Sequence, residues 1–135
     1  MKKILLGIAI LVVAYVAFYF LARPIASHHR IVSRMLGPVY YPLRLMTASH
    51  AAFMHATGVL TQDKNGNWGV LYPKPPADAQ GRNTVNGIGF NVPDSLADTV
   101  QSSKGKLVEV DIGKVPDPDY LSNERPVLIS VAPAK

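Results

Sequence analysis

The side chains best suited to acid–base or metal chemistry are the four histidines, which all lie between residues 28 and 55. Neutral imidazole is a common metal ligand, so a metal or haem site is the sharpest hypothesis for this segment. His28 and His29 are adjacent and would point to different faces of a helix, and His50 and His55 are not the three or four residues apart that align two ligands. No carboxylate precedes residue 60. We therefore expect neither a bound metal nor a cofactor.

Two short motifs resemble fragments of catalytic or phosphate-binding patterns. Gly87-Ile88-Gly89 lacks the third glycine of a phosphate loop and the helix whose N-terminal amides would hold a phosphate. Ser103 and Lys106 have the Ser-x-x-Lys spacing of some acyl-transfer enzymes, but Gly105 ends the predicted helix between them and the accompanying motifs are missing. Neither motif predicts an activity.

Carboxylates are the remaining candidates for acid–base work. Glu109 and Asp111 would share one face of a strand, where a pair could bind a cation or share a proton, but a solvated strand face is the simpler interpretation. Asp117 and Asp119 lie in a loop without the ligand spacing of a calcium site. We expect the protein not to be an enzyme; the alternative is a hidden site built on histidines at the membrane surface.

Length and composition limit the size and type of fold that could position a functional site. The chain has 135 residues, which is one domain at most, and no cysteine. The absence of cysteine excludes disulfides, thiolate metal sites and a cysteine nucleophile. An apolar N-terminal segment occupies part of the chain, so the folded domain that remains is small and has a modest core.

Residues 4–22 contain no charged residue and no proline, which predicts a helix long enough to cross the ~30 Å hydrocarbon core of a bilayer. A cleaved signal peptide is the alternative, but the apolar run exceeds the usual ~7–15 residues and no small-x-small cleavage site follows it. We expect a single-pass anchor in the cell (inner) membrane. Positive charges balance across the segment, and because long domains translocate largely regardless of charge, we expect the C-terminal domain to be extracytoplasmic.

The net charge of +5 is unevenly distributed. Residues 1–60 carry six basic and no acidic residues, whereas residues 61–135 carry eight basic and nine acidic residues. Basic groups beside a membrane attract anionic headgroups by ~1 kcal/mol each. A nucleic-acid-binding domain would carry the basic patch itself, so nucleic acid is not the expected partner. The residues expected to contact the membrane surface or a protein partner are Arg23, Arg30, Arg34, Tyr40, Tyr41 and Arg44.

The periodicity divides the chain into an anchor (1–22), a basic helical segment (23–57) and a β domain (58–135). Pro24 and Gly37-Pro38 are expected to break the helical segment. A second helical pattern, from Leu43 to Met54, is expected to end at Gly58. Such an amphipathic element lies on a membrane surface or docks on a partner, unless it is a connector packed on its own β domain.

The β domain is predicted from turn and alternation signals. Asn65-Gly66 predicts a type I′ hairpin between two strands. Ser95 and Asp98 resemble the capping box of a short helix. Two long loops, 73–86 and 115–126, are expected. The remaining strands are residues 87–92, 106–114 and 127–131.

This element order is that of a five-stranded OB-like barrel, in which a helix separates the third and fourth strands. An open sandwich or an α+β sheet with one helix fits nearly as well. In an OB-like barrel the loop before the last strand often contributes to binding, which singles out Tyr120 and Arg125 as a possible ligand loop.

The leading functional expectation is a membrane-anchored accessory or assembly subunit. It would bind a larger membrane protein complex through its β domain and basic segment, and anionic lipid headgroups through its arginines. The alternative is a membrane-tethered OB-like module that binds an oligosaccharide, a peptide or, less readily, nucleic acid.

Overall fold

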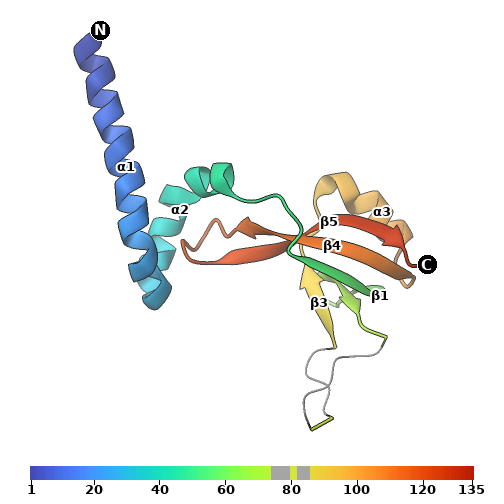
Figure 1. Ribbon diagram of the computed structural model, residues 1–135. Helices are drawn as coiled ribbons and strands as arrows, with labels where there is room; N and C mark the ends of the chain where they lie inside the picture. The colour runs from blue at the N-terminus through green and yellow to red at the C-terminus, as the bar shows by residue number, and fades with distance from the viewer. Residues whose placement is uncertain (74–79, 82–85) are drawn as a thin grey trace. The chain divides into compact units, whose positions relative to one another are not determined.

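The computed structural model describes residues 1–73, 80–81 and 86–135 (Figure 1). The chain forms two compact units. The helical unit contains Met1–Thr47 and Pro116–Glu124, and the sheet unit contains Ala48–Val115 and Arg125–Lys135. Most of the predicted loop 73–86 lies outside the described residues.

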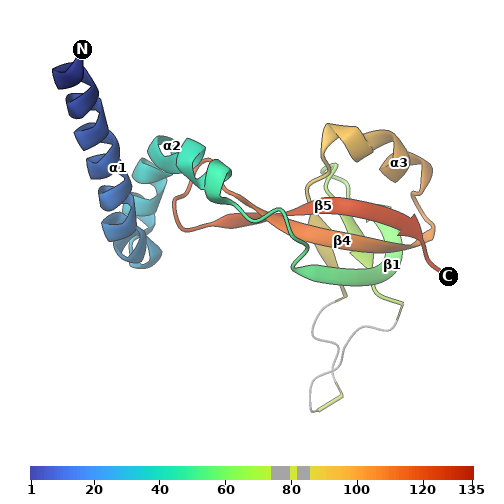
Figure 2. The ribbon, with the colours of Figure 1, turned by 45° about the horizontal axis from the view of Figure 1, so that its top comes forward.

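The helical unit is built from two helices, α1 (Lys2–His28) and α2 (Arg30–Thr47). They meet at His29, whose extended backbone turns the chain (φ −124°, ψ 99°). In both ribbon views α2 lies beside the C-terminal part of α1 (Figure 1, Figure 2). The buried side chains between these helices and the segment 116–124 are Tyr19, Ala22, Ala26, Tyr40 and Leu121.

The expected breaks at Pro24 and at Gly37-Pro38 do not occur, because α1 runs through Pro24 and α2 runs through Pro38 and Pro42. A proline removes one backbone donor and disfavours a helix interior. Tertiary packing outweighs that penalty here, since Ala22 and Ala26 are buried on either side of Pro24, and Gly37 and Tyr40 are buried on either side of Pro38.

The helix predicted from Leu43 to Gly58 is wrong beyond Thr47. The first strand begins at Met54 and pairs antiparallel with the fourth, from Met54↔Ile112 to Val59↔Leu107. The apolar residues of this short segment fit a helical period and a strand period equally well. Pairing with a distant strand decided between them.

The sheet unit is a five-stranded antiparallel open sheet in the order β3-β2-β1-β4-β5. One isolated parallel bridge joins Asn91, just after β3, to Val127 in β5, with the Leu128 amide donating to the Asn91 carbonyl at 2.9 Å. The strands are β1 (Met54–Gln62), β2 (Trp68–Leu71), β3 (Gly87–Phe90), β4 (Leu107–Pro116) and β5 (Glu124–Pro133).

The hairpin predicted at Asn65-Gly66 is confirmed, but its turn is not the predicted type I′, because that turn needs a positive φ at both residues and Asn65 does not have one. β1 and β2 pair from Val59↔Leu71 to Gln62↔Trp68, and Gly66 has the positive φ (87°) that the turn requires. The Asp63 carboxylate accepts hydrogen bonds from the backbone amides of Asn65 and Asn67, both at 2.8 Å. The turn is therefore fixed by local sequence.

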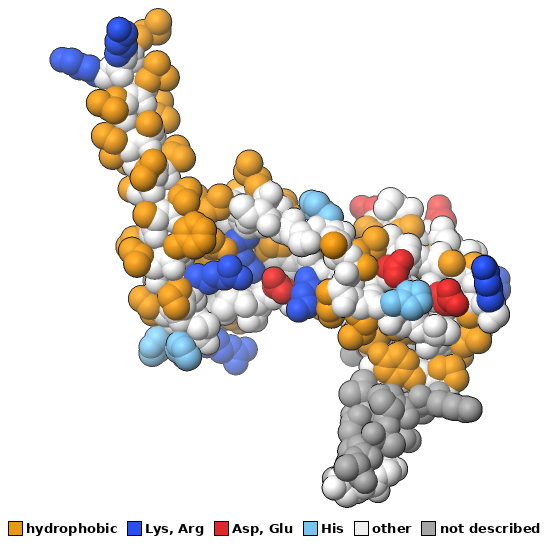
Figure 3. All heavy atoms as spheres, viewed as in Figure 1, with side chains coloured by type: hydrophobic (Ala, Val, Ile, Leu, Met, Phe, Trp, Pro, Cys, Tyr) orange, Lys and Arg blue, Asp and Glu red, His pale blue; other side chains and the backbone are white. Residues whose placement is uncertain are grey.

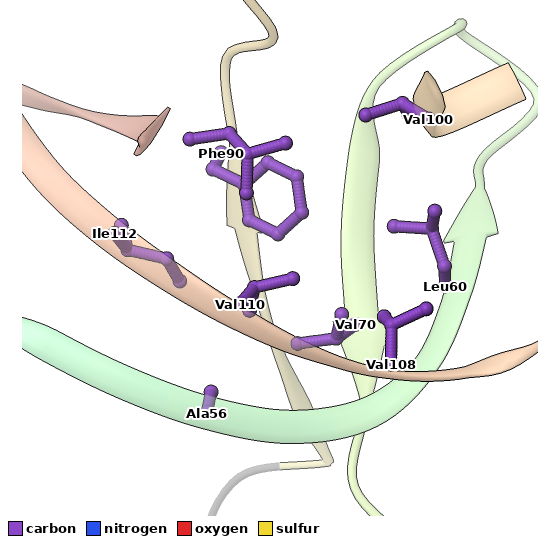
Figure 4. Close-up of a cluster of buried hydrophobic side chains, with 9 residues drawn as sticks. Ala56, Leu60, Val70, Phe90, Val100, Val108, Val110 and Ile112 are labelled. Carbon is purple, nitrogen blue, oxygen red and sulfur yellow. The ribbon is translucent and has the colours of Figure 1, made fainter. Parts of the chain in front are cut away.

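Alternating inward-facing residues of the strands form the core of the sheet unit, with Val100 from α3 beside them (Figure 4). A 3₁₀ turn, η1 (Asp94–Leu96), leads into α3 (Ala97–Ser102). The capping box expected from Ser95 and Asp98 does not form, because neither helix start has a side-chain capping hydrogen bond. The core side chains are Ala56, Leu60, Val70, Phe90, Val100, Val108, Val110, Ile112 and Leu128.

Candidate membrane and partner interface

Apolar side chains cover the outside of α1, as Figure 3 shows on the visible face. Within the described part of the chain, α1 is the one helix long and apolar enough to cross a membrane. Exposed apolar residues continue past its midpoint, at Phe18, Phe20, Leu21 and Ile25. A water-soluble helix would bury such a surface.

Helix α2 buries polar or small residues and exposes apolar ones, which is the reverse of a surface helix in a water-soluble protein. Its buried residues, Ser33, Gly37, Tyr40 and Arg44, are polar or small. They recur at helical spacing and so lie on one face. The opposite face is apolar and is between 54% and 84% exposed. We call this face the apolar stripe and define it by Ile31, Met35, Val39 and Met46.

Arg44 links α2 to the segment 116–124 by hydrogen bonds. Its guanidinium donates hydrogen bonds to the carbonyls of Asp117 (3.0 Å), Tyr120 (2.5 Å) and Asn123 (2.5 Å). Only 7% of the residue is exposed. A planar guanidinium has five donors in a fixed fork and suits several carbonyls at once. Arg44 therefore holds the segment 116–124, which we call the β4–β5 loop, against α2.

Ser33 and Gly37 of α2 also contact the β4–β5 loop. The Leu121 amide donates to the Ser33 carbonyl at 2.9 Å, and the Ser122 amide donates to the Ser33 hydroxyl at 3.1 Å. A Cβ at Gly37 would lie 2.6 Å from backbone atoms of Asp119 and Tyr120. The glycine is needed because the loop backbone approaches the helix too closely for any side chain.

The residues predicted as an interaction surface fall into two groups. Arg23, Arg30 and Arg34 are exposed and Tyr41 is half-buried, so they remain candidates for contact with lipid or a partner. Tyr40 and Arg44 are buried inside the helical unit, and their side chains contact the protein itself.

The two residues of the possible ligand loop belong to different units. Tyr120 is half-buried in the helical unit, with the Arg30 guanidinium 5.9 Å from its ring centroid, and Arg125 is an exposed residue of the sheet unit. Because the β4–β5 loop carrying Tyr120 is held on α2, it is not an open binding loop of the sheet unit.

Sequence reasoning missed the roles of Ser33 and Gly37. The signal was available, because small or polar residues at positions 33, 37, 40 and 44 form one helical stripe. An inward polar stripe opposite an outward apolar one is the pattern expected where a helix contacts lipid.

The four histidines do not assemble into a site, and no group of three or more potential ligands occurs among the described residues. His55 does contact a carboxylate. Its Nδ1 lies 2.9 Å from Asp111, whose other oxygen accepts a hydrogen bond from the Ser130 hydroxyl at 2.7 Å. The carboxylate stands between the two groups, so the histidine is not placed to activate the serine.

The His55–Asp111 contact predicts a pH dependence. The hydrogen bond to Asp111 raises the pKa of His55 above its ordinary 6.5, and the hydrogen bonds from His55 and then Ser130 lower the pKa of Asp111 below 3.8. The contact therefore stabilises the sheet below pH 6.5 and weakens as the pH rises through the raised pKa of His55. At the acid end it is lost as Asp111 protonates below pH 3.8.

Titration of the His55 ring by NMR tests this prediction. Asp111→Asn should move the pKa of His55 down towards 6.5, because the main cause of the shift is removed. Glu109→Gln is the matched control: Glu109 acts on His55 only through a smaller charge effect, so this variant should change the pKa less. An unchanged pKa in Asp111→Asn would contradict the contact.

A hollow of about 330 Å³ lies in the sheet unit between the β1–β2 turn, the end of β3 and α3. Its lining combines the rings of Trp68 and Phe90 with the amide groups of Asn67, Asn91 and Gln101. Aromatic faces and uncharged amides suit a neutral polar ligand better than a phosphate.

The chain matches no model of a known protein family, no curated protein and no solved structure.

Proposed function

We propose that the protein is a membrane-anchored accessory or assembly subunit of a larger membrane protein complex. α1 anchors it in the inner membrane, and the sheet unit lies outside the cytoplasm. Anionic lipid headgroups and a protein partner meet the basic edge formed by Arg23, Arg30 and Arg34. No catalytic role is assigned.

The observation that carries this proposal is the outward apolar surface of both helices. α1 and the apolar stripe of α2 expose large hydrophobic residues, while Ser33, Tyr40 and Arg44 of α2 are turned inwards. A contiguous apolar surface of this extent is typical of contact with lipid or with other membrane-embedded protein. The exposed arginines beside it, with no acidic residue before position 60, favour an anionic surface.

Extraction in mild detergent followed by native mass determination tests the proposal. We expect the chain to co-purify with a protein partner at a fixed stoichiometry. Arg34→Glu should weaken retention of the partner about thirtyfold, because it changes the charge by two units and each unit near such a surface contributes about 1 kcal/mol. Lys64→Glu, an equal charge change at an exposed turn of the sheet unit, is the control and should retain the partner. A chain that purifies alone or only with itself would refute the proposal.

The second candidate is an OB-like ligand-binding module. It is supported by the strand order with the helix after β3, by the parallel bridge Asn91↔Val127 towards barrel closure, and by the hollow beside Trp68. An oligosaccharide or peptide fits that lining better than nucleic acid, because residues 61–135 carry slightly more acidic than basic residues. Purification of the chain without a partner would favour this function over the first.

A further inference from the structure

The contact between α1 and α2 shows how deep α2 lies in the membrane when α1 spans it. If residues 4–22 of α1 fill the hydrocarbon core, Tyr15 lies seven residues before Ala22 and roughly 10 Å inside the membrane boundary. The Tyr15 hydroxyl donates to the Val39 carbonyl of α2 at 2.7 Å. The rings of Tyr15 and Tyr40 are 4.8 Å apart. The middle of α2 therefore lies at the depth of Tyr15.

Placing α2 on the membrane surface would conflict with the length of α1. The part of α1 before Tyr15 would then be the only part in the hydrocarbon, and its eleven apolar residues span roughly 16 Å of a core that is ~30 Å thick. The exposed side chains of Phe18, Leu21 and Ile25 would face water. Both consequences disfavour a surface position.

We infer that α2 is sunk below the lipid headgroups, with its apolar stripe against acyl chains, and does not lie flat on the membrane surface. The inference rests on the proposed function, because it takes α1 as a membrane span. The polarity of α2 agrees with it: Ser33, Tyr40 and Arg44 are buried inside the protein, whereas Met35 and Val39 are exposed.

Both ends of α2 reach polar surroundings. Arg30 contacts the Tyr120 ring near the start of α2, and Arg44 near its end binds carbonyls of the same β4–β5 loop. Arg30 and Arg34 are exposed and long enough to extend to lipid phosphates from below.

Two observations favour lipid over protein as the partner of the apolar stripe. The apolar stripe follows directly on the lipid-exposed surface of α1 within one compact unit. The only charged residues of α2 are basic, which complements phosphate headgroups at the boundary.

Site-directed spin labelling of the full chain tests the depth directly, because the chain has no cysteine and every label is unique. Single cysteines replace Leu11 and Phe18 on α1, Met35 and Val39 on α2, and Lys64 as the water reference; all five residues are exposed. The labelled chain is reconstituted in vesicles of phosphatidylcholine and phosphatidylglycerol. Collision with oxygen and with a water-soluble nickel chelate then gives the depth of each label.

We expect the Val39 label to be at least as deep as the Phe18 label, with high oxygen and low nickel accessibility at both. Low oxygen and high nickel accessibility at Val39 and Phe18, with Leu11 still in lipid, would place α2 at the surface and overturn the inference while leaving the anchor intact. Low accessibility to both reagents at Met35 and Val39 would show that protein covers the stripe, which also overturns it. Nickel access at Leu11 would refute the membrane span itself, and with it the proposed function.

Discussion

Arg44→Met is expected to release the β4–β5 loop from α2. The substitution keeps the length of the side chain but removes every donor, so the carbonyls of Asp117 and Tyr120 lose their hydrogen bonds from the guanidinium. Removing a donor from a buried or partly buried carbonyl costs about 1–3 kcal/mol for each bond. We expect the loop to be destabilised by about 3 kcal/mol.

Limited proteolysis with chymotrypsin measures this effect. Cleavage after Tyr120 or Leu121 requires the loop to open, so its rate follows the open population when closing is fast. A change of about 3 kcal/mol corresponds to an increase of about a hundredfold in that rate. Arg34→Met, on an exposed position of the same helix, is the control and should leave the rate unchanged.

Arg44→Lys separates geometry from charge. An ammonium group keeps the charge but is compact and lacks the planar fork that reaches three carbonyls. We expect faster cleavage than in the native protein and slower cleavage than in Arg44→Met. Equal cleavage in all three proteins would show that Arg44 does not hold the loop.

Gly37→Ala is expected to have the second-largest effect. The new methyl group would lie 2.6 Å from the Asp119 carbonyl carbon and the Tyr120 nitrogen, and backbone cannot yield as a flexible side chain would. Overpacking of this kind costs about 1–3 kcal/mol, of which the better helix propensity of alanine offsets up to about 1 kcal/mol. The hydrogen bonds from Leu121 and Ser122 to Ser33 would weaken.

Hydrogen exchange of the loop peptide, read by mass spectrometry, checks this prediction. We expect the amides of Leu121 and Ser122 to exchange about tenfold or more faster in Gly37→Ala, which corresponds to about 1.4 kcal/mol. Gly7→Ala is the matched control, because it makes the same change in α1 where nothing lies within 4 Å. Unchanged exchange in Gly37→Ala would mean that the loop does not pack on this face of α2.

Local sequence was enough for the elements whose signals are strong and short-range. Residues 4–22 are uniformly apolar and required a long helix, and Asn65-Gly66 required a tight turn through the positive φ of Gly66. Alternation fixed the strand containing Val108, Val110 and Ile112. These signals depend on neighbours in the chain and do not need a partner elsewhere.

Where sequence patterns disagreed about an element, tertiary contacts decided whether it is helix or strand and where it ends. The prolines of α1 and α2 predicted breaks, but packing around Ala26 and Tyr40 kept both helices continuous. Met54 fits a helix by spacing, yet its pairing with Ile112 of β4 made it strand. Propensities of a few tenths of a kcal/mol to a few kcal/mol are easily outweighed by the contacts of a whole element.

By itself the sequence determined that this chain has one long apolar helix, an acid-free basic segment and a small sheet with one short helix. Only the tertiary structure decided which face of α2 is inside. Hydrophobic periodicity shows that a helix has two faces, but the identity of the buried face depends on what it packs against. Here the β4–β5 loop, more than 70 residues away along the chain, binds Arg44 and turns the apolar stripe outwards.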